Sequence, residues 1–239
     1  MSTLLLRLAA PMQSWGADSK YNIRKTNREP TKSGVLGMIS AALGCRRDDA
    51  GTFARLSQLR FGVRVDHEGT IMQDYQTVHR VLPKKKADAQ EKFETTLTYR
   101  DYLHDAVFVA GLEGPREELE QVEEALSHPV YPLFLGRRSC PPTGRICLGI
   151  EETDLESALR SCPWQVPEWR QARSPKKLRL IMDSTDPRED FDCLYDVPVS
   201  YSPLKREYSC RNIHHDWVTI SDGKSTEHDP MSELWEVLE

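Results

Sequence analysis

The sequence lacks the features that mark several common classes of protein. No apolar run approaches the ~20 residues that a membrane-spanning helix needs, and Arg7 interrupts the apolar start too early for a secretory signal. The six cysteines are widely spaced and form no CxxC pair, which argues against a zinc site and against a disulfide framework. We therefore expect a cytoplasmic protein with reduced, mostly buried thiols and with neither a metal nor a cofactor.

Sequence patterns of familiar catalytic sites are also missing. The chain has no GxSxG, Walker, HExxH or GxGxxG pattern. Metal-free cleavage of RNA needs a general acid or base near neutral pH, and the candidates for it are His79, His104, Tyr75 and Tyr102. Because lone histidines are more often surface or structural residues, we assign no catalytic residue.

Charge is distributed unevenly along the 239 residues. The net charge is −5, but residues 1–64 carry +7 and residues 107–239 carry −10. Such a split suits a protein that meets a polyanion with one end and a different partner with the other, although charge runs are more often only solvated faces.

A basic loop leads into the first expected helix. Its cations are Arg24, Lys25, Arg28 and Lys32. Ser33 is the candidate N-cap of a helix over residues 33–43, which Gly44 closes. The free N–H groups and the dipole at a helix start favour an anion, so we expect either a phosphate site or a capped core helix beside a solvated loop.

Hydrophobic periodicity predicts an α+β fold. The expected elements are strands at 3–9, 59–66, 105–114 and 145–150 and helices at 33–43 and 115–127. Their βαββαβ order predicts a ferredoxin-like (RRM-like) palm over residues 1–150. The strand at 59–66 alternates in polarity, so Arg60 and Arg64 should face outwards.

Residues 70–103 interrupt the palm with two β-like arms joined by a polar connector. We interpret this segment as an inserted β-hairpin thumb with Lys84, Lys85 and Lys86 near its tip, where lysines can bind a phosphate backbone or simply meet solvent. Beyond the palm we expect a small β-rich C-terminal region at 151–221 and an acidic tail at 222–239.

A set of cations and aromatic residues can converge if this topology is right. The basic loop, the thumb lysines, and Arg137 and Arg138 in a bend at Gly136 would form a binding surface. Trp15, Tyr75 and Tyr99 could stack on bases or pack in the core.

Five sequence blocks resemble the CasD family of subunits of the type I-E CRISPR surveillance complex, Cascade, a branch of the Cas five-type RAMP proteins. The blocks are LRLAAPMQSWG (6–16), PTKSGVLGMISAALG (30–44), QDYQTV (73–78), YRDYLHDAVFVAGL (99–112) and LGRRSCPP (135–142). They occur in the family's order, which makes them more specific than any single motif. The region after residue 151 resembles the family only loosely.

The resemblance implies a non-catalytic RNA-binding subunit that caps the 5′ handle of the crRNA and contacts the subunits CasC and CasA, reaching target DNA through the assembled complex. The RNA-facing positions it implies are Lys32, Ser33, Arg137, Arg138 and the arm around Tyr75, with Gln13 and Trp15 nearby. His79 and the three thumb lysines are expected to contact RNA or a partner subunit.

Two other functions remain open at this point. Type I-C relatives of the family cleave the repeat RNA themselves, so a metal-independent endoribonuclease is the second hypothesis. A protein-interaction module without an RNA role is the third, and the acidic C-terminal half and the glutamate-rich face of the helix at 115–127 favour it.

Overall fold

The computed structural model describes residues 1–16, 22–81, 93–172, 174, 176–184, 192–202 and 206–220. The predicted thumb lysines Lys84, Lys85 and Lys86 and the predicted acidic tail lie outside these ranges. Within them, no helix is both long enough and apolar enough to cross a membrane.

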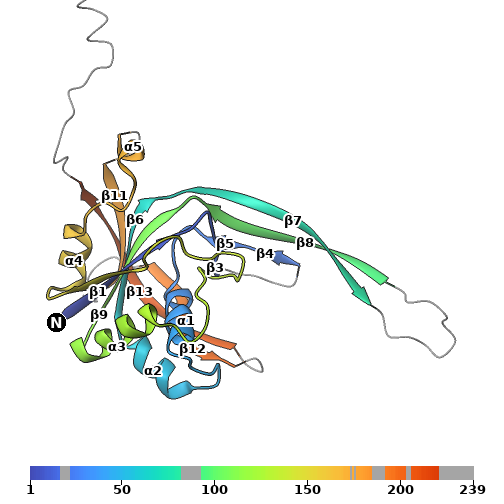
Figure 1. Cartoon of the computed structure of the whole chain (residues 1–239), viewed down its shortest axis with the longest axis horizontal. Helices are drawn as coiled ribbons and strands as arrows, with labels where there is room; N and C mark the ends of the chain where they lie inside the picture. The colour runs from blue at the N-terminus through green and yellow to red at the C-terminus, as the bar shows by residue number, and fades with distance from the viewer. Residues whose placement is uncertain are drawn as a thin grey trace, which may run out of the picture.

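A βαββαβ palm forms the centre of the chain (Figure 1). Its elements are β1 (Ser2–Ala9), α1 (Lys32–Ala42), β6 (Arg60–His67), β9 (Val107–Gly114), α3 (Arg116–Ser127) and β10 (Cys147–Glu151). The sheet order is β10-β1-β9-β6, and every neighbouring pair is antiparallel. The last strand therefore lies beside the first, and the third lies between the first and the second, as the predicted ferredoxin-like palm requires.

The ends of α1 show how local sequence sets a helix. Gly44 follows the helix with a φ of 73°, a left-handed conformation that glycine adopts without strain, so the predicted end of the helix is confirmed. The predicted N-cap is wrong by two residues: the Thr31 side chain, not that of Ser33, accepts a hydrogen bond from the Gly34 N–H at 3.2 Å. Both hydroxyl residues suit an N-cap, and the extended backbone of Thr31 decides between them.

Helices cover both faces of the sheet. Leu4 and Leu6 of β1 point into the main core, which α1, α3 and α2 (Ala50–Ser57) complete. Leu5 points the other way, into a second core that contains Leu155 and Leu159 of α4 (Leu155–Ser161). The continuous apolar run of β1 is thus explained by burial on both sides.

Burial on both sides also corrects the expectation for β6. Arg64, predicted to face outwards, is completely buried beneath α4. Its guanidinium pairs with Asp66 at 2.6 Å and donates to the carbonyl oxygens of Leu159 and Cys162 at the end of α4. Alternating polarity indicated a solvent-exposed face, whereas the polar side chains there satisfy the carbonyls of a helix end.

Three C-terminal strands extend the palm's sheet beyond β6. They are β11 (Lys177–Asp183), β13 (Arg206–Thr219) and β12 (Asp192–Tyr201), in the spatial order β6-β11-β13-β12, and the short helix α5 (Glu168–Gln171) precedes them. The region is β-rich as expected, but it continues the palm rather than forming a layer of its own. Its two outer strands are longer than their apolar pattern indicates, because many of their side chains are exposed.

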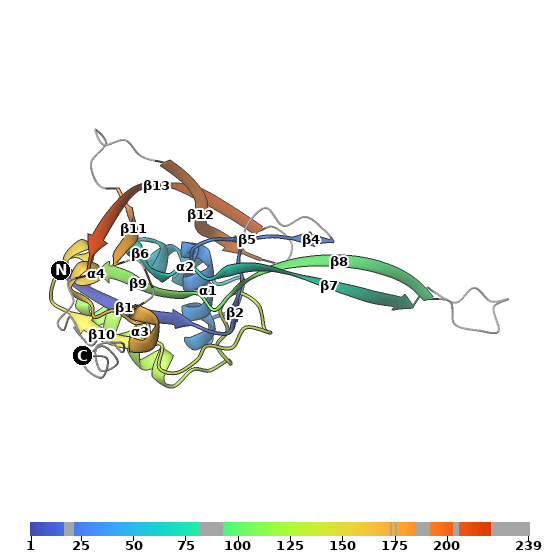
Figure 2. The ribbon, with the colours of Figure 1, turned by 90° about the horizontal axis from the view of Figure 1, so that it is seen from above.

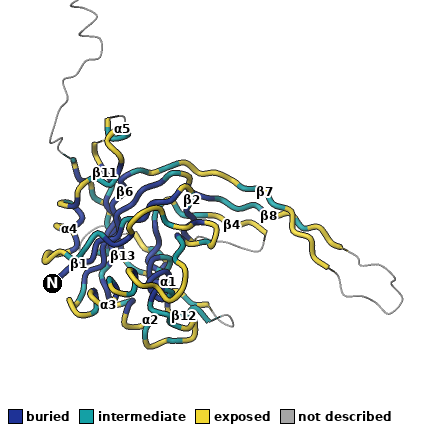
Figure 3. Tube along the Cα trace, in the orientation of Figure 1, coloured by how far each residue is buried: buried dark blue, intermediate teal, exposed yellow. Residues whose placement is uncertain are grey.

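The thumb is a long antiparallel hairpin that projects from the palm (Figures 1 and 2). Strands β7 (Thr70–Val81) and β8 (Phe93–His104) pair along their whole described length. Strand β8 is partly buried near the palm and exposed at its far end, whereas β7 is mostly exposed throughout (Figure 3). Four short strands lie near its base: β2 (Met12–Gln13), β3 (Trp15–Gly16), β4 (Ile23–Arg24) and β5 (Thr26–Asn27).

Candidate nucleic-acid interface

The N-terminus of α1 already holds an anion, the carboxylate of Asp196 from β12. Its Oδ2 accepts a hydrogen bond from the Lys32 backbone N–H at 2.8 Å, while Arg211 donates to both carboxylate oxygens at 2.6 and 3.0 Å. The Tyr201 hydroxyl donates to the carbonyl oxygen of Ser33. The helix start therefore attracts a negative charge as expected, but the group is internal, and the first turn is tied to the outer strands of the sheet.

The Lys32 side chain lies beneath the surface. It is 4% exposed, and its Nζ is 3.2 Å from Asp183 Oδ2. Burial lowers the pKa of this amine despite the attraction of Asp183. Burial also opposes the charged form of Arg211, but the hydrogen bonds to Asp196 and Asp183 and the negative charges of both carboxylates together outweigh burial and raise its pKa. These contacts contradict the predicted place of Lys32 on an RNA-facing surface.

Gln13 and Trp15 form the floor beneath the basic loop. Both are fully buried, Trp15 Nε1 donates to Gln13 Oε1 at 3.2 Å, and Gln13 Nε2 donates to the Ala106 carbonyl at 2.7 Å. A Cβ at Gly34 would lie 2.9 Å from the indole ring, so that glycine makes room for a core side chain rather than for a ligand. Of the two roles expected for Trp15, stacking on bases or packing in the core, the structure shows packing in the core.

The Gly136 bend is held tightly against the N-terminal segment. Ser14 N donates to the Leu135 carbonyl at 3.1 Å, and Gly136 has a φ of 87°. A Cβ at Gly136 would lie 1.6 Å from the Ser14 carbonyl oxygen, which no side chain could occupy. Only glycine lets this bend approach the backbone so closely.

Arg137 joins the bend to the base of the thumb. Its guanidinium donates to the carbonyl oxygens of Asp101 at 3.1 Å, Arg24 at 3.0 Å and Lys25 at 3.4 Å, and it lies 4.6 Å from the ring centre of Tyr102. These contacts use much of its donor capacity. Arg137 thus positions the backbone that carries Arg24 and Lys25, in addition to contributing its own charge.

Three arginines gather on one side of the thumb base, where Asp74 of β7 lies opposite Arg100. Strand β4 pairs in parallel with β8 so that Arg24 lies opposite Arg100, and Arg137 stacks on Tyr102, two residues further along that side of β8. We call Arg24, Arg100 and Arg137 the cationic face; the exposed Arg138 follows Arg137 on the bend. Among the described residues, the buried Nε of Arg100 has no hydrogen-bond partner.

Sequence reasoning missed Arg100. The signal was present, because alternation along the second thumb arm puts Arg100 on the same side as Tyr102. What the sequence could not supply was the pairing of β4 with β8, which brings Arg24 beside it.

The opposite side of the thumb base is aromatic and apolar. Tyr75 lies opposite Tyr99, with ring centres 5.4 Å apart in an edge-on arrangement, and Ile23 lies on the other side of Tyr99. Tyr75 is 57% exposed. The expected convergence of Tyr75 with the basic residues is not found, since strand alternation places them on opposite sides of one ribbon. We call Ile23, Tyr75 and Tyr99 the aromatic face.

The four candidates for acid–base chemistry do not come together. His79 and His104 lie opposite Thr95 and Thr70, nine residues apart along the hairpin, which corresponds to roughly 30 Å. The His79 ring Nδ1 is 3.1 Å from Thr95 Oγ1. Tyr102 is buried under Arg137, and its hydroxyl lies 3.4 Å from Ser139 Oγ. His79 and His104 therefore cannot share a proton-transfer step.

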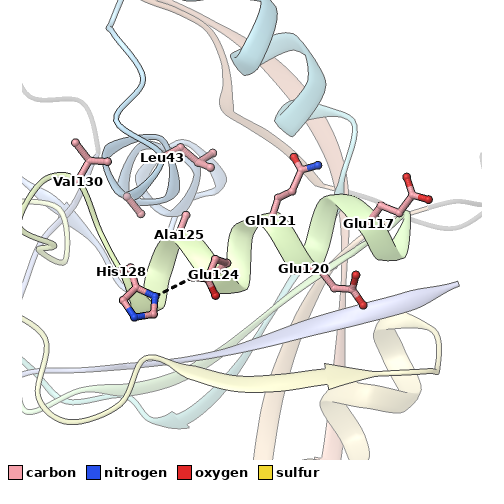
Figure 4. A pocket seen from close by; sticks show the side chains of 9 residues that line it. Leu43, Glu117, Glu120, Gln121, Glu124, Ala125, His128 and Val130 are labelled. Atoms are coloured by element: carbon pink, nitrogen blue, oxygen red, sulfur yellow. Dashed lines mark ion pairs between the residues drawn. The ribbon is translucent and has the colours of Figure 1, made fainter.

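An acidic groove of 840 Å³ separates the end of α1 from α3 (Figure 4). Its lining residues are Ala42, Leu43, Glu117, Glu120, Gln121, Glu124, Ala125, His128 and Val130. Glu124 and His128 lie 3.0 Å apart. Three glutamates along one wall would repel a polyanion, which leaves the cationic face as the better RNA site.

Comparison with known proteins agrees with this architecture. The family described as CRISPR-associated protein (Cas_Cas5) matches residues 3–214. The CRISPR system Cascade subunit CasD of Escherichia coli (strain K12) is 37% identical over 171 residues, which cover 66% of this chain and 75% of that protein. Two solved structures are each 33% identical and cover 91% of this chain. One is described as the crystal structure of a Cas protein, with 95% of its chain covered and a TM-score of 0.67. The other is a CRISPR RNA-guided surveillance complex, with 90% covered and a TM-score of 0.73. The chain therefore belongs to the Cas5 family of CRISPR-associated proteins.

Proposed function

We propose that the chain is a non-catalytic, crRNA-binding subunit of a type I-E Cascade complex, in which it caps the 5′ handle of the crRNA. The cationic face carries this proposal, since Arg137 fixes the backbone of Arg24 and Lys25 beside Arg100 and so forms a preorganised site for a phosphate backbone. The similarity to a Cascade subunit and to a surveillance complex supports the same assignment.

The two sides of the thumb base have different roles in this proposal. The cationic face binds RNA, and the aromatic face, continued along the thumb by exposed Leu97, Val81 and Phe93, contacts a protein neighbour. CasC, the backbone subunit, and CasA, the large subunit, are the partners we propose. Target DNA is then met in the cytoplasm through the assembled complex.

Binding of a handle-containing RNA by charge-reduced variants tests this function. In the full-length protein, the double substitution Arg24→Gln, Arg138→Gln removes two exposed cations. Each phosphate contact on a single strand contributes about 0.7 to the slope of log affinity against log salt concentration. Losing two contacts removes about 1.4 from this slope, so at 0.1 M salt, one decade below 1 M, we expect the affinity to fall about 25-fold. A matched control is Arg46→Gln, Arg47→Gln, which removes two exposed arginines from the loop between α1 and α2. Equal losses in both variants would contradict a site at the thumb base.

Incubation of the full-length protein with cognate repeat RNA, without divalent metal, tests the endoribonuclease alternative. We expect the RNA to be recovered intact, because the two histidines on the thumb, His79 and His104, lie far apart. Site-specific cutting of cognate repeat RNA that disappears in His79→Ala or His104→Ala would refute the non-catalytic role.

A further inference from the structure

Two exposed cysteines lie next to each other on the outermost strands of the sheet. In the pairing of β12 with β13, Cys193 lies opposite Asn212 and Tyr195 lies opposite Cys210. The cysteines are therefore diagonal neighbours on one side of the two strands. The Cys210 thiol is close enough to the Cys193 thiol to raise its pKa. The other four cysteines have no such arrangement among the described residues, and Cys140, Cys147 and Cys162 are buried.

The side of the strands that carries this pair is open to solvent. Leu194 and Arg211, the intervening residues, point the other way, where the Arg211 guanidinium lies 5.1 Å from the ring centre of Phe61. Both Cys193 and Cys210 are exposed, and Tyr195 on their side is 76% exposed. A small disulfide in solution can therefore reach either sulfur.

We propose that Cys193 and Cys210 form a redox modification site, closing a reversible disulfide by exchange with a low-molecular-weight disulfide such as glutathione disulfide. The thiolate of one cysteine attacks a sulfur of the reagent, forms a mixed disulfide and expels one glutathione thiolate. The second cysteine, as thiolate, attacks the protein sulfur of the mixed disulfide and expels the other glutathione. The two thiol protons leave with the two glutathione molecules, so two protein thiols are oxidised as one reagent disulfide is reduced.

Either cysteine can make the first attack, because both are exposed, and the other cysteine then resolves the mixed disulfide.

The bond is expected to be labile rather than structural. Diagonal neighbours have Cα atoms roughly 7–8 Å apart, whereas a relaxed disulfide needs roughly 4.4–6.8 Å, so closure requires a small shift of β12. That strand is paired on one side only, and its register with β13 shifts between Tyr195 and Val197. Strained, exposed disulfides are the easily reduced ones, so the bond should form only under oxidising conditions.

Oxidation would act on β12, the strand that holds the first turn of α1 in place. Beyond Cys193, β12 carries Asp196 and Tyr201, which hold the first turn of α1. A covalent link to β13 restrains that anchor. Slower hydrogen exchange of the backbone amides in residues 192–202 is the physical consequence.

Thiol mapping of the full-length protein tests the proposal. After incubation with glutathione disulfide and alkylation of remaining thiols, we expect a linked Cys193–Cys210 peptide and its loss on adding dithiothreitol. Cys210→Ser and Cys193→Ser should instead carry a glutathione adduct on the remaining cysteine, while the control Cys45→Ser should still form the link. Slower hydrogen exchange of residues 192–202 on oxidation should occur in the wild type and not in Cys210→Ser.

Three outcomes would overturn the proposal. The first is a wild-type protein in which both cysteines stay free, or carry separate glutathione adducts, under conditions that glutathionylate the serine variants. The second is a link between two chains, seen as a covalent dimer. The third is a slowing of hydrogen exchange in residues 192–202 on oxidation that is as large in Cys210→Ser as in the wild type.

Discussion

Replacing Asp196 by asparagine should lower the free energy of unfolding by about 3 kcal/mol. The carboxylate is 5% exposed and accepts three hydrogen bonds, two from Arg211 and one from the Lys32 backbone N–H. Removing one partner of a buried ion pair costs ~3 to 5 kcal/mol, because the other charge remains buried and unpaired. We take the lower end because Arg211 keeps a second partner, Asp183.

Thermal unfolding of the full-length protein measures this effect. For a chain of this size, about 3 kcal/mol corresponds to a midpoint lower by roughly 6 to 12 °C. The matched control is Asp192→Asn on the same strand, where an exposed carboxylate lies 3.4 Å from the His215 ring and its removal should change stability by less than about 0.5 kcal/mol. An Asp196→Asn midpoint equal to that of the control would refute the anchoring of α1 by β12.

Three further predictions follow from buried groups and from a tight bend. Lys32→Met should lower stability but leave the salt slope of RNA binding unchanged, whereas the Arg24→Gln, Arg138→Gln variant should lower the slope by about 1.4 at unchanged stability; titrations at several salt concentrations distinguish them. Gly136→Ala should destabilise the fold by about 3 kcal/mol or more in denaturant titrations, since the added carbon has neither space nor a favourable φ. Burial raises the pKa of the Cys147 thiol to about 11. Between about pH 9 and pH 11 the unfolded chain then loses a proton that the folded protein keeps, so stability should fall by up to about 1.4 kcal/mol per pH unit, and Cys147→Ala should flatten that slope. A slope unchanged in Cys147→Ala would contradict this assignment.

The palm and the thumb were predictable because their signals are local. Apolar residues recur at helical spacing in α1 and α3, and the four palm strands are short apolar runs bounded by turns. The long hairpin was recognisable from two β-like arms around a polar connector. The structure places every one of these elements within a few residues of its predicted range.

Side-chain environments were less predictable because they depend on elements distant in sequence. Arg64 was expected to face solvent, but α4, nearly a hundred residues later, covers it. Lys32 was expected to meet RNA, but its amine pairs with Asp183 of β11 and its backbone N–H donates to Asp196 of β12. Alternation and charge reveal that a side chain is polar, and only the tertiary contacts reveal whether its partner is water, RNA or another part of the chain.

The sequence by itself determined the order of the helices and strands of the palm and thumb, the ends of α1 to within two residues and a resemblance to the family that the comparisons then showed. These depend on periodicity, capping residues and short blocks, all of which are local along the chain. The tertiary structure alone decided which basic residues gather at the surface of the thumb base. The pairing of β4 with β8 and the contacts of Arg137 bring Arg24 and Arg100 together on one side of the thumb base, while the same ribbon turns Tyr75 to the other. The register between paired strands sets these positions, and no single stretch of the sequence specifies that register.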